Sequence, residues 1–159
     1  MVNPAFRAGE KLPAAKLQQL GYDDTFTPVL GATTTPPTLG AGATQAGLIW
    51  VNGNKVDIWF DIIFGSSGAA AGSGTYQIAL PAELPFAANF PSTFTIGTAY
   101  LHDATATPDQ AGIIADPISD LVRFRRFSNN AQVTNAVPWT WAVNDAISGH
   151  FSYLTDFGA

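Results

Sequence analysis

The residues Gln45–Phe64 read QAGLIWVNGNKVDIWFDIIF, and this stretch decides the fold class. In its second half, apolar residues alternate with polar or aromatic ones, which is the pattern of an extended strand with one face on a core. Asn52–Gly53 between the two apolar runs is a strong signal for a two-residue hairpin turn. The stretch therefore predicts two antiparallel strands, Gln45–Val51 and Lys55–Phe64.

Similar signals recur along the chain from Thr25 onward, where short β-rich runs are separated by Gly, Pro and Asn. No helical stretch lies between these runs, which argues against alternating strand–helix units. We predict an all-β fold, an antiparallel β-sandwich of the jelly-roll-like type. The further strands are expected at Thr25–Leu30, Thr75–Leu80, Thr93–His102, Ala111–Ala115, Asp120–Arg126, Pro138–Val143 and Gly149–Thr155, with a turn at Asp116–Pro117, a loop at Thr33–Gly42 and a flexible loop at Gly65–Gly74.

The segment 1–24 differs from the rest and is expected to form a unit apart from a sandwich domain at 25–159. Leu12, Leu17 and Leu20 fall close to one face of a short helix over Pro13–Leu20. Two helical turns are not stable alone in water, so this helix must pack on something. Two interpretations stay open: the helix folds back onto its own sandwich, or it anchors or oligomerises the chain.

The composition indicates a protein that shows little charge to solvent. Only 12% of the 159 residues are charged and 47% are hydrophobic, whereas about a quarter of residues are charged in a typical globular protein. A weakly charged surface promotes association, so we expect other subunits to cover part of it. The net charge is −5, and the only basic cluster is Arg123, Arg125 and Arg126. We therefore expect no nucleic-acid partner.

Several other classes are excluded by what the sequence lacks. The absence of cysteine excludes disulfides, thiolate metal sites and a cysteine nucleophile. No apolar run reaches the length of a signal peptide or a membrane span. We therefore expect synthesis in the host cytoplasm without a signal peptide, and no membrane insertion.

The residue types that carry catalysis do not occur in convincing patterns. His102 and His150 show no metal-ligand spacing. Asp57 and Asp61 share a strand face, about 13 Å apart along the strand, which suits a retaining glycosidase pair poorly. The Gly/Ser loops lack the context of a serine nucleophile. We predict no catalytic residue, no metal and no cofactor, and hence no enzyme.

The aromatic residues are the strongest candidates for a functional contact. Trp139 and Trp141 have the same parity and so lie on one face of a predicted strand. Such residues more often fill a core or a subunit interface than form a sugar-stacking platform. Trp59 shares its face with Asp57 and Asp61, away from the purely apolar face. It is therefore the best candidate for an interface or glycan contact.

Several segments, taken in order, resemble those of tailed-bacteriophage virion proteins, namely the β-sandwich modules of minor tail proteins, tail fibres and head fibres. The matching segments are Phe6–Leu17 (FRAGEKLPAAKL), Tyr22–Leu30 (YDDTFTPVL), Gly47–Gly65, Gly72–Pro81 (GSGTYQIALP) and Thr134–Tyr153. Two departures matter: Pro13 replaces the usual Thr or Ser helix cap, and residues 81–127 match only loosely.

The resemblance implies a structural virion protein on the surface of a tail or capsid, such as a tail or head fibre, spike or decoration subunit. It implies a symmetric oligomer, expected to be a homotrimer. Its N-terminal segment would dock on other virion proteins through Phe6, Leu12, Leu17 and Leu20. The alternative is a carbohydrate- or receptor-binding module for a bacterial surface glycan, and a polysaccharide depolymerase is a third class.

Overall fold

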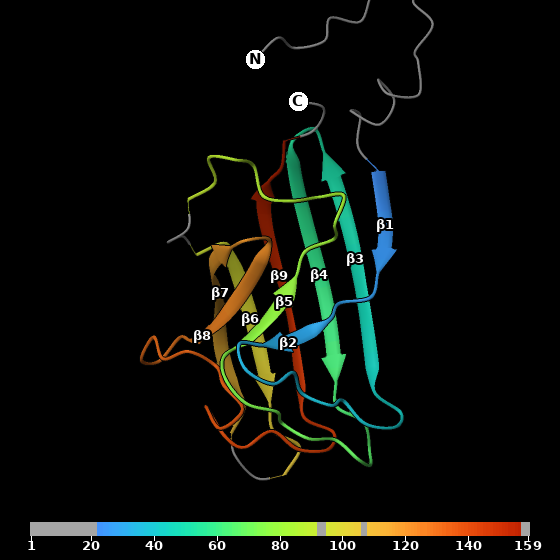
Figure 1. Cartoon of the computed structure of the whole chain (residues 1–159), viewed down its shortest axis with the longest axis vertical. Helices are drawn as coiled ribbons and strands as arrows, with labels where there is room; N and C mark the ends of the chain where they lie inside the picture. Colours follow the sequence, from blue (N-terminus) through green and yellow to red (C-terminus); the bar gives the residue numbers. More distant parts are fainter. Residues whose placement is uncertain (1–21, 92–94, 106–107, 157–159) are drawn as a thin grey trace, which may run out of the picture.

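The computed structural model describes residues 22–91, 95–105 and 108–156, and their regular elements are all β-strands (Figure 1). The strands are β1 (Tyr22–Phe26), β2 (Leu30–Ala32), β3 (Thr44–Asn52), β4 (Lys55–Ile63), β5 (Tyr76–Ala79), β6 (Gly97–His102), β7 (Gln110–Ile118), β8 (Leu121–Arg126) and β9 (Ala146–Leu154). The predicted helix over Pro13–Leu20 and most of the predicted N-terminal unit lie outside the described residues. Among the described residues, no helix has the length and hydropathy needed to cross a membrane.

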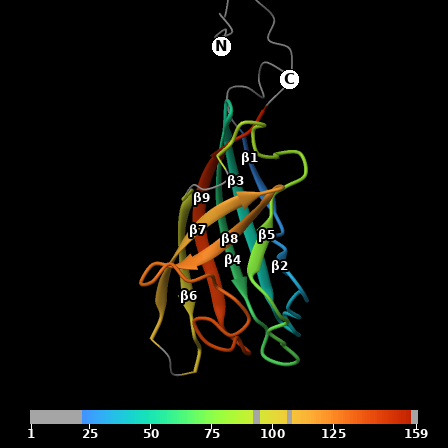
Figure 2. The same ribbon diagram turned by 60° about the vertical axis from the view of Figure 1, so that its left-hand side comes forward.

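The strands pair into one nine-stranded sheet in the order β1-β3-β4-β9-β6-β7-β8-β5-β2, and every neighbouring pair is antiparallel. The edge strands β1 and β2 stand at opposite ends of this order, yet only Thr27–Val29 separate them in the chain. The sheet must therefore curl until its two edges approach each other (Figure 2). The predicted all-β, antiparallel class is confirmed. The finer prediction of a jelly-roll-like sandwich is not confirmed, because the strands form one continuous sheet.

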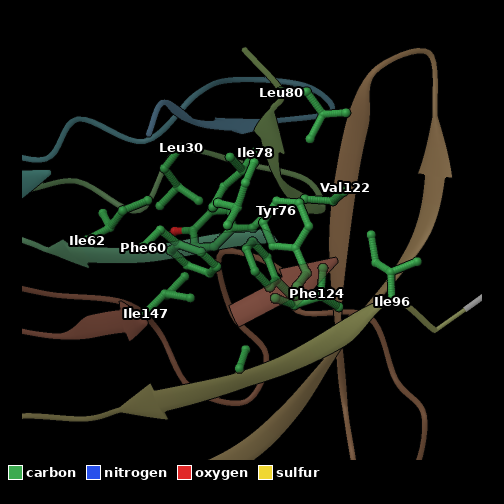
Figure 3. Close-up of a cluster of buried hydrophobic side chains, with 14 of the residues drawn as sticks. Leu30, Phe60, Ile62, Tyr76, Ile78, Leu80, Ile96, Val122, Phe124 and Ile147 are labelled. Carbon is green, nitrogen blue, oxygen red and sulfur yellow. The ribbon is translucent and has the colours of Figure 1, made fainter. Parts of the chain in front are cut away.

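The core lies inside the curl, where the inward side chains of opposite walls meet. In β4 the burial follows the predicted alternation, with Val56, Ile58, Phe60 and Ile62 buried. The ring of Phe60 lies 6.0 Å from that of Phe124 on β8, which belongs to the facing wall. Figure 3 shows side chains from β2, β4, β5, β8 and β9 converging in this space. Burial of each of these large apolar side chains contributes about 1.5–3 kcal/mol to the free energy of folding. This burial is the main driving force for the curl.

One predicted strand is wrong. Pro138–Val143 is irregular and not a strand. Trp139 and Trp141 are nevertheless both buried, as the core interpretation of these residues expects, and their rings lie 5.2 Å apart. The indole nitrogen of Trp141 donates to the carbonyl of Thr134 at 2.9 Å. Ring packing, and not a strand ladder, therefore produces the alternating burial in this segment.

Two turns lie later in the chain than predicted. The β7–β8 turn is at Ser119–Asp120, where both residues have positive φ (48° and 61°), whereas Asp116–Pro117 lie within β7. The pairing of β7 with β8 shifts register between Ala115 and Ile118. A register irregularity of this kind tolerates the missing N–H of a proline. In the β3–β4 hairpin, Asn52 pairs with Lys55, so the turn residues are Gly53 and Asn54.

The two long loops predicted near the start of the chain pair with each other. Thr35 and Ser73 exchange backbone hydrogen bonds of 3.0 and 2.9 Å, and Thr38 and Ala70 exchange bonds of 2.9 and 2.8 Å. Backbone hydrogen bonds thus hold the segment Gly65–Gly74 at several points. The sequence, which predicts a flexible loop there, does not reveal these bonds. Its glycines permit the close approach, since a Cβ on Gly72 would lie 2.3 Å from the carbonyl oxygen of Thr35.

Candidate functional site

The outer face of the sheet carries large apolar side chains that are exposed to solvent. We define the outer aromatic face as the exposed side chains of Leu48, Trp50, Trp59, Tyr100 and Leu154, on strands β3, β4, β6 and β9. Monomeric proteins rarely expose large contiguous apolar patches, and those that exist mark binding or assembly sites. This face is therefore the candidate functional site.

Trp59 sits at the centre of the outer aromatic face because of the two-residue period of β4. Its neighbours Ile58 and Phe60 point into the core, so Trp59 points outward and 44% of it is exposed. Across the ladders it faces Leu48 on one side and His150 on the other. The indole stacks on the imidazole of His150 with ring centroids 4.6 Å apart. The prediction that Trp59 lies away from the apolar core is confirmed, while its role as a contact stays a prediction.

A hydrogen-bonded group surrounds Asp57, next to the stacked pair. The Asp57 carboxylate accepts a short hydrogen bond from the hydroxyl of Ser152 and pairs with Lys55 Nζ at 2.9 Å. His150 Nε2 lies 3.6 Å from the same carboxylate. Burial pushes the pKa of Asp57 upward, but the hydrogen bonds from Ser152 and Lys55 and the nearby positive charge outweigh it, so the pKa lies below its usual value. Asp57 is therefore a fixed anion that orients this part of the face.

A second polar group lies on β6 and the loop that follows it. Asp109 accepts hydrogen bonds from the hydroxyl of Tyr100 and from the backbone N–H of Asp103, and lies 2.7 Å from Nδ1 of His102. The hydrogen bond from Tyr100, followed by those from His102 and Asp103, lowers the pKa of Asp109. The same bond raises the pKa of Tyr100. His102 is thus held by a local partner, Asp109.

An open hollow of about 960 Å³ lies beside Trp59 on the outer side of strands β1, β3, β4 and β9. It is lined by Thr25, Phe26, Thr27, Gln45, Ala46, Gly47, Leu48, Trp59, Phe60, Asp61, Ser148 and Gly149. The volume falls in the usual range of small-molecule sites, about 300–1,000 Å³. The hollow combines an aromatic wall with hydroxyl, amide and carboxylate groups, which is the composition of a binding site for a polar ligand.

Sequence reasoning found only part of this site. It singled out Trp59 but missed Trp50, Tyr100 and the pairing of His150 with Trp59. The parity of the strands could have placed Trp50 outward, but the contact between β4 and β9 depends on pairing between distant segments. The predicted assembly residues, Phe6, Leu12, Leu17 and Leu20, lie outside the described residues. In the described part of the chain, no three His, Asp or Glu side chains gather as a metal site.

Comparison with known proteins gives one fold relationship. No protein-family model matches the sequence, and no curated protein matches it. Among solved structures, the chain is similar to the Dettilon tailspike protein, with a TM-score of 0.53 and 16% sequence identity. The match covers 84% of this chain and 24% of the tailspike chain, so this chain spans about a quarter of that protein's length. At this identity the likeness shows a shared all-β fold.

Proposed function

We propose that the chain is a structural module of a bacteriophage tail and belongs to a symmetric oligomer, expected to be a homotrimer, on the surface of the particle. The observation that carries the proposal is the fold shared with a tailspike protein over 84% of this chain. The order of the sequence segments that resemble virion modules supports it independently. The role is noncatalytic, and the sandwich or jelly-roll description of the module belongs to the same proposal.

The proposed assembly uses the N-terminal segment and leaves the outer aromatic face accessible. The sequence spacing of Leu12, Leu17 and Leu20 is that of one apolar helix face, which would need a partner. Such a face would suit contact with identical copies and with other virion proteins.

The oligomer is tested in the full-length chain by sedimentation velocity at micromolar concentration. The wild-type chain is expected to sediment as a discrete oligomer, and Leu17→Glu with Leu20→Glu should shift it to monomer because a charge at an apolar contact is costly. The matched control, Leu48→Glu on the outer aromatic face, should keep the oligomer. A wild-type monomer, unchanged by the Leu17 and Leu20 substitutions, would contradict the proposal. Antibodies against the chain should label the tails of particles that carry it.

A second candidate function, recognition of a bacterial surface glycan, is favoured by the exposure of Trp59 beside a hollow that contains polar groups. A tail module meets the host surface, so recognition and assembly are compatible in one chain. Here Trp59 supplies the aromatic contact.

A further inference from the structure

The floor of the hollow is a single row of residues across four strands. Phe26 pairs with Gly47, Gly47 with Phe60, and Phe60 with Gly149. The two phenylalanine rings belong to the inner side, so this row presents only backbone to the outside. A Cβ on Gly47 would lie 2.2 Å from the Phe26 ring, which shows how closely the rings cover these glycines. Glycines in strand interiors permit such close approaches, and a row without outward side chains leaves the outer side hollow.

The two walls of the hollow have different chemistry. One wall is the row of Thr25, Leu48 and Trp59, which follows the same register. His150 covers part of Trp59 but does not line the hollow, so the indole meets the hollow with another part of its surface. The opposite wall contains Asp61, which pairs with Ser148 on β9 and Ala46 on β3. An aromatic surface thus stands opposite a carboxylate and a hydroxyl, across an open floor.

The polar side of the hollow contains a fixed amide and a carboxylate that is unpaired in the described part of the chain. Gln45 Nε2 donates to the carbonyl of Pro28 at 2.7 Å, which fixes the amide at the end of the wall. Among the described residues, Asp61 is the only charged one that lines the hollow. Within the described residues, nothing forms a hydrogen bond or ion pair with its carboxylate. The carboxylate is therefore an available acceptor for hydroxyl donors and repels an anionic ligand.

We propose that this hollow binds one uncharged pyranose ring of a surface glycan. The indole of Trp59 stacks on the apolar C–H face of the sugar, and the carboxylate of Asp61 accepts hydrogen bonds from its hydroxyl groups. The hydroxyl of Ser148 adds a further partner. Binding of a surface glycan at this hollow rests on the proposed function, because a tail module is what meets the host surface. Specificity for neutral over acidic sugars follows because the described residues of the lining include a carboxylate and no cationic side chain.

Binding is tested on the full-length chain, in whatever oligomeric state it adopts, with methyl glycosides of glucose, galactose, mannose and N-acetylglucosamine by ligand-observed NMR and calorimetry. At least one of them is expected to bind with a dissociation constant on the order of 1–10 mM, the range of a single weak subsite. Methyl glucuronoside, the acidic counterpart of the glucoside, should bind at least about tenfold more weakly than the best neutral sugar.

Substitutions of residues that line the hollow test whether the sugar binds there. Trp59→Ala and Asp61→Asn should each weaken binding about tenfold or more. Ala46→Phe should do the same by filling the hollow without removing a contact. Phe127→Ala, which removes an exposed aromatic side chain outside both the lining and the outer aromatic face, should retain wild-type affinity. The alternative outcomes overturn the proposal: no saturable binding of any neutral glycoside, equal binding of the glucuronoside, or unchanged binding by folded Trp59→Ala and Ala46→Phe.

The glycoside measurements are independent of assembly. A chain that forms the oligomer and labels phage tails but binds no glycoside contradicts only this subsite. A chain that binds glycosides but is monomeric and absent from particles contradicts only the proposed tail function.

Discussion

At the scale of single residues, Asp57 shows how the outer aromatic face is held in order. Its carboxylate, on β4, accepts a hydrogen bond from the hydroxyl of Ser152 on β9 and forms an ion pair with Lys55. The same strand face carries Asp61, which has no such partner among the described residues. Two carboxylates on the same face of one strand, with Trp59 between them, therefore have different roles: Asp57 stabilises the sheet, and Asp61 is available to a ligand.

The lowered pKa of Asp57 predicts a dependence of stability on pH. A carboxyl whose pKa is lower in the folded chain than its unfolded value, about 3.9, stabilises the fold above that value. The stabilisation is lost as the pH falls through the folded pKa. Urea unfolding between about pH 5 and pH 2 should therefore show a smaller loss of stability for Asp57→Asn than for wild type. Parallel pH profiles of the unfolding free energy for wild type and Asp57→Asn would contradict the assignment.

At the scale of elements, the glycines under the phenylalanine rings set how closely the strands approach. A Cβ on Gly149 would lie 2.6 Å from the carbonyl oxygen of Thr98 and 3.0 Å from Cζ of Phe60. Backbone cannot move away as a flexible side chain can, so Gly149→Ala should destabilise the fold by about 1–3 kcal/mol in urea unfolding.

The matched control for this substitution is Gly31→Ala in β2. A Cβ on Gly31 would meet Gln77 at 3.7 Å, an ordinary van der Waals distance. The added methyl group should leave stability unchanged or raise it by up to about 1 kcal/mol, because alanine restricts the unfolded chain. Equal effects at the two positions would show that the approach of Phe60 to Gly149 does not limit the packing.

The strands also show where local sequence patterns are enough to predict the structure. The strands β3 and β4 follow the prediction closely, because alternation and a glycine turn specify them locally. Pro138–Val143 also alternates, but it is not a strand: its two tryptophan rings pack against each other, and Trp141 packs against Phe64 and Tyr76 in the core. The predicted strand Thr25–Leu30 is divided between β1 and β2, because the chain crosses from one edge of the sheet to the other at Thr27–Val29. Local patterns do not reveal such a crossing.

At the scale of the whole molecule, the order of the strands in the sheet could not be predicted from the sequence. The pairing of β9 with both β4 and β6 joins segments far apart in the chain. The stacked pair of Trp59 and His150 exists only because of this pairing. The sequence thus identified Trp59 as a candidate but could not supply its neighbours. The predicted N-terminal contacts stay predictions.

The single core predicts one cooperative unfolding transition for the described fold. Phe60 and Phe124 link the two walls, so neither wall has a separate core to retain. Far-UV circular dichroism and tryptophan fluorescence, which reports on the buried Trp139 and Trp141 among others, should give the same urea midpoint at a fixed protein concentration. Midpoints that differ by more than about 0.5 M urea would indicate walls that unfold separately.

The central position of β9 has a consequence for biosynthesis. This strand is made after every other strand of the sheet, yet it fills the gap between β4 and β6. Until it emerges from the ribosome, both neighbours present unpaired edges, which are templates for intermolecular aggregation. Folding of the sheet therefore waits for translation to pass residue 154, and a polypeptide interrupted before that point would be a substrate for chaperones and proteases.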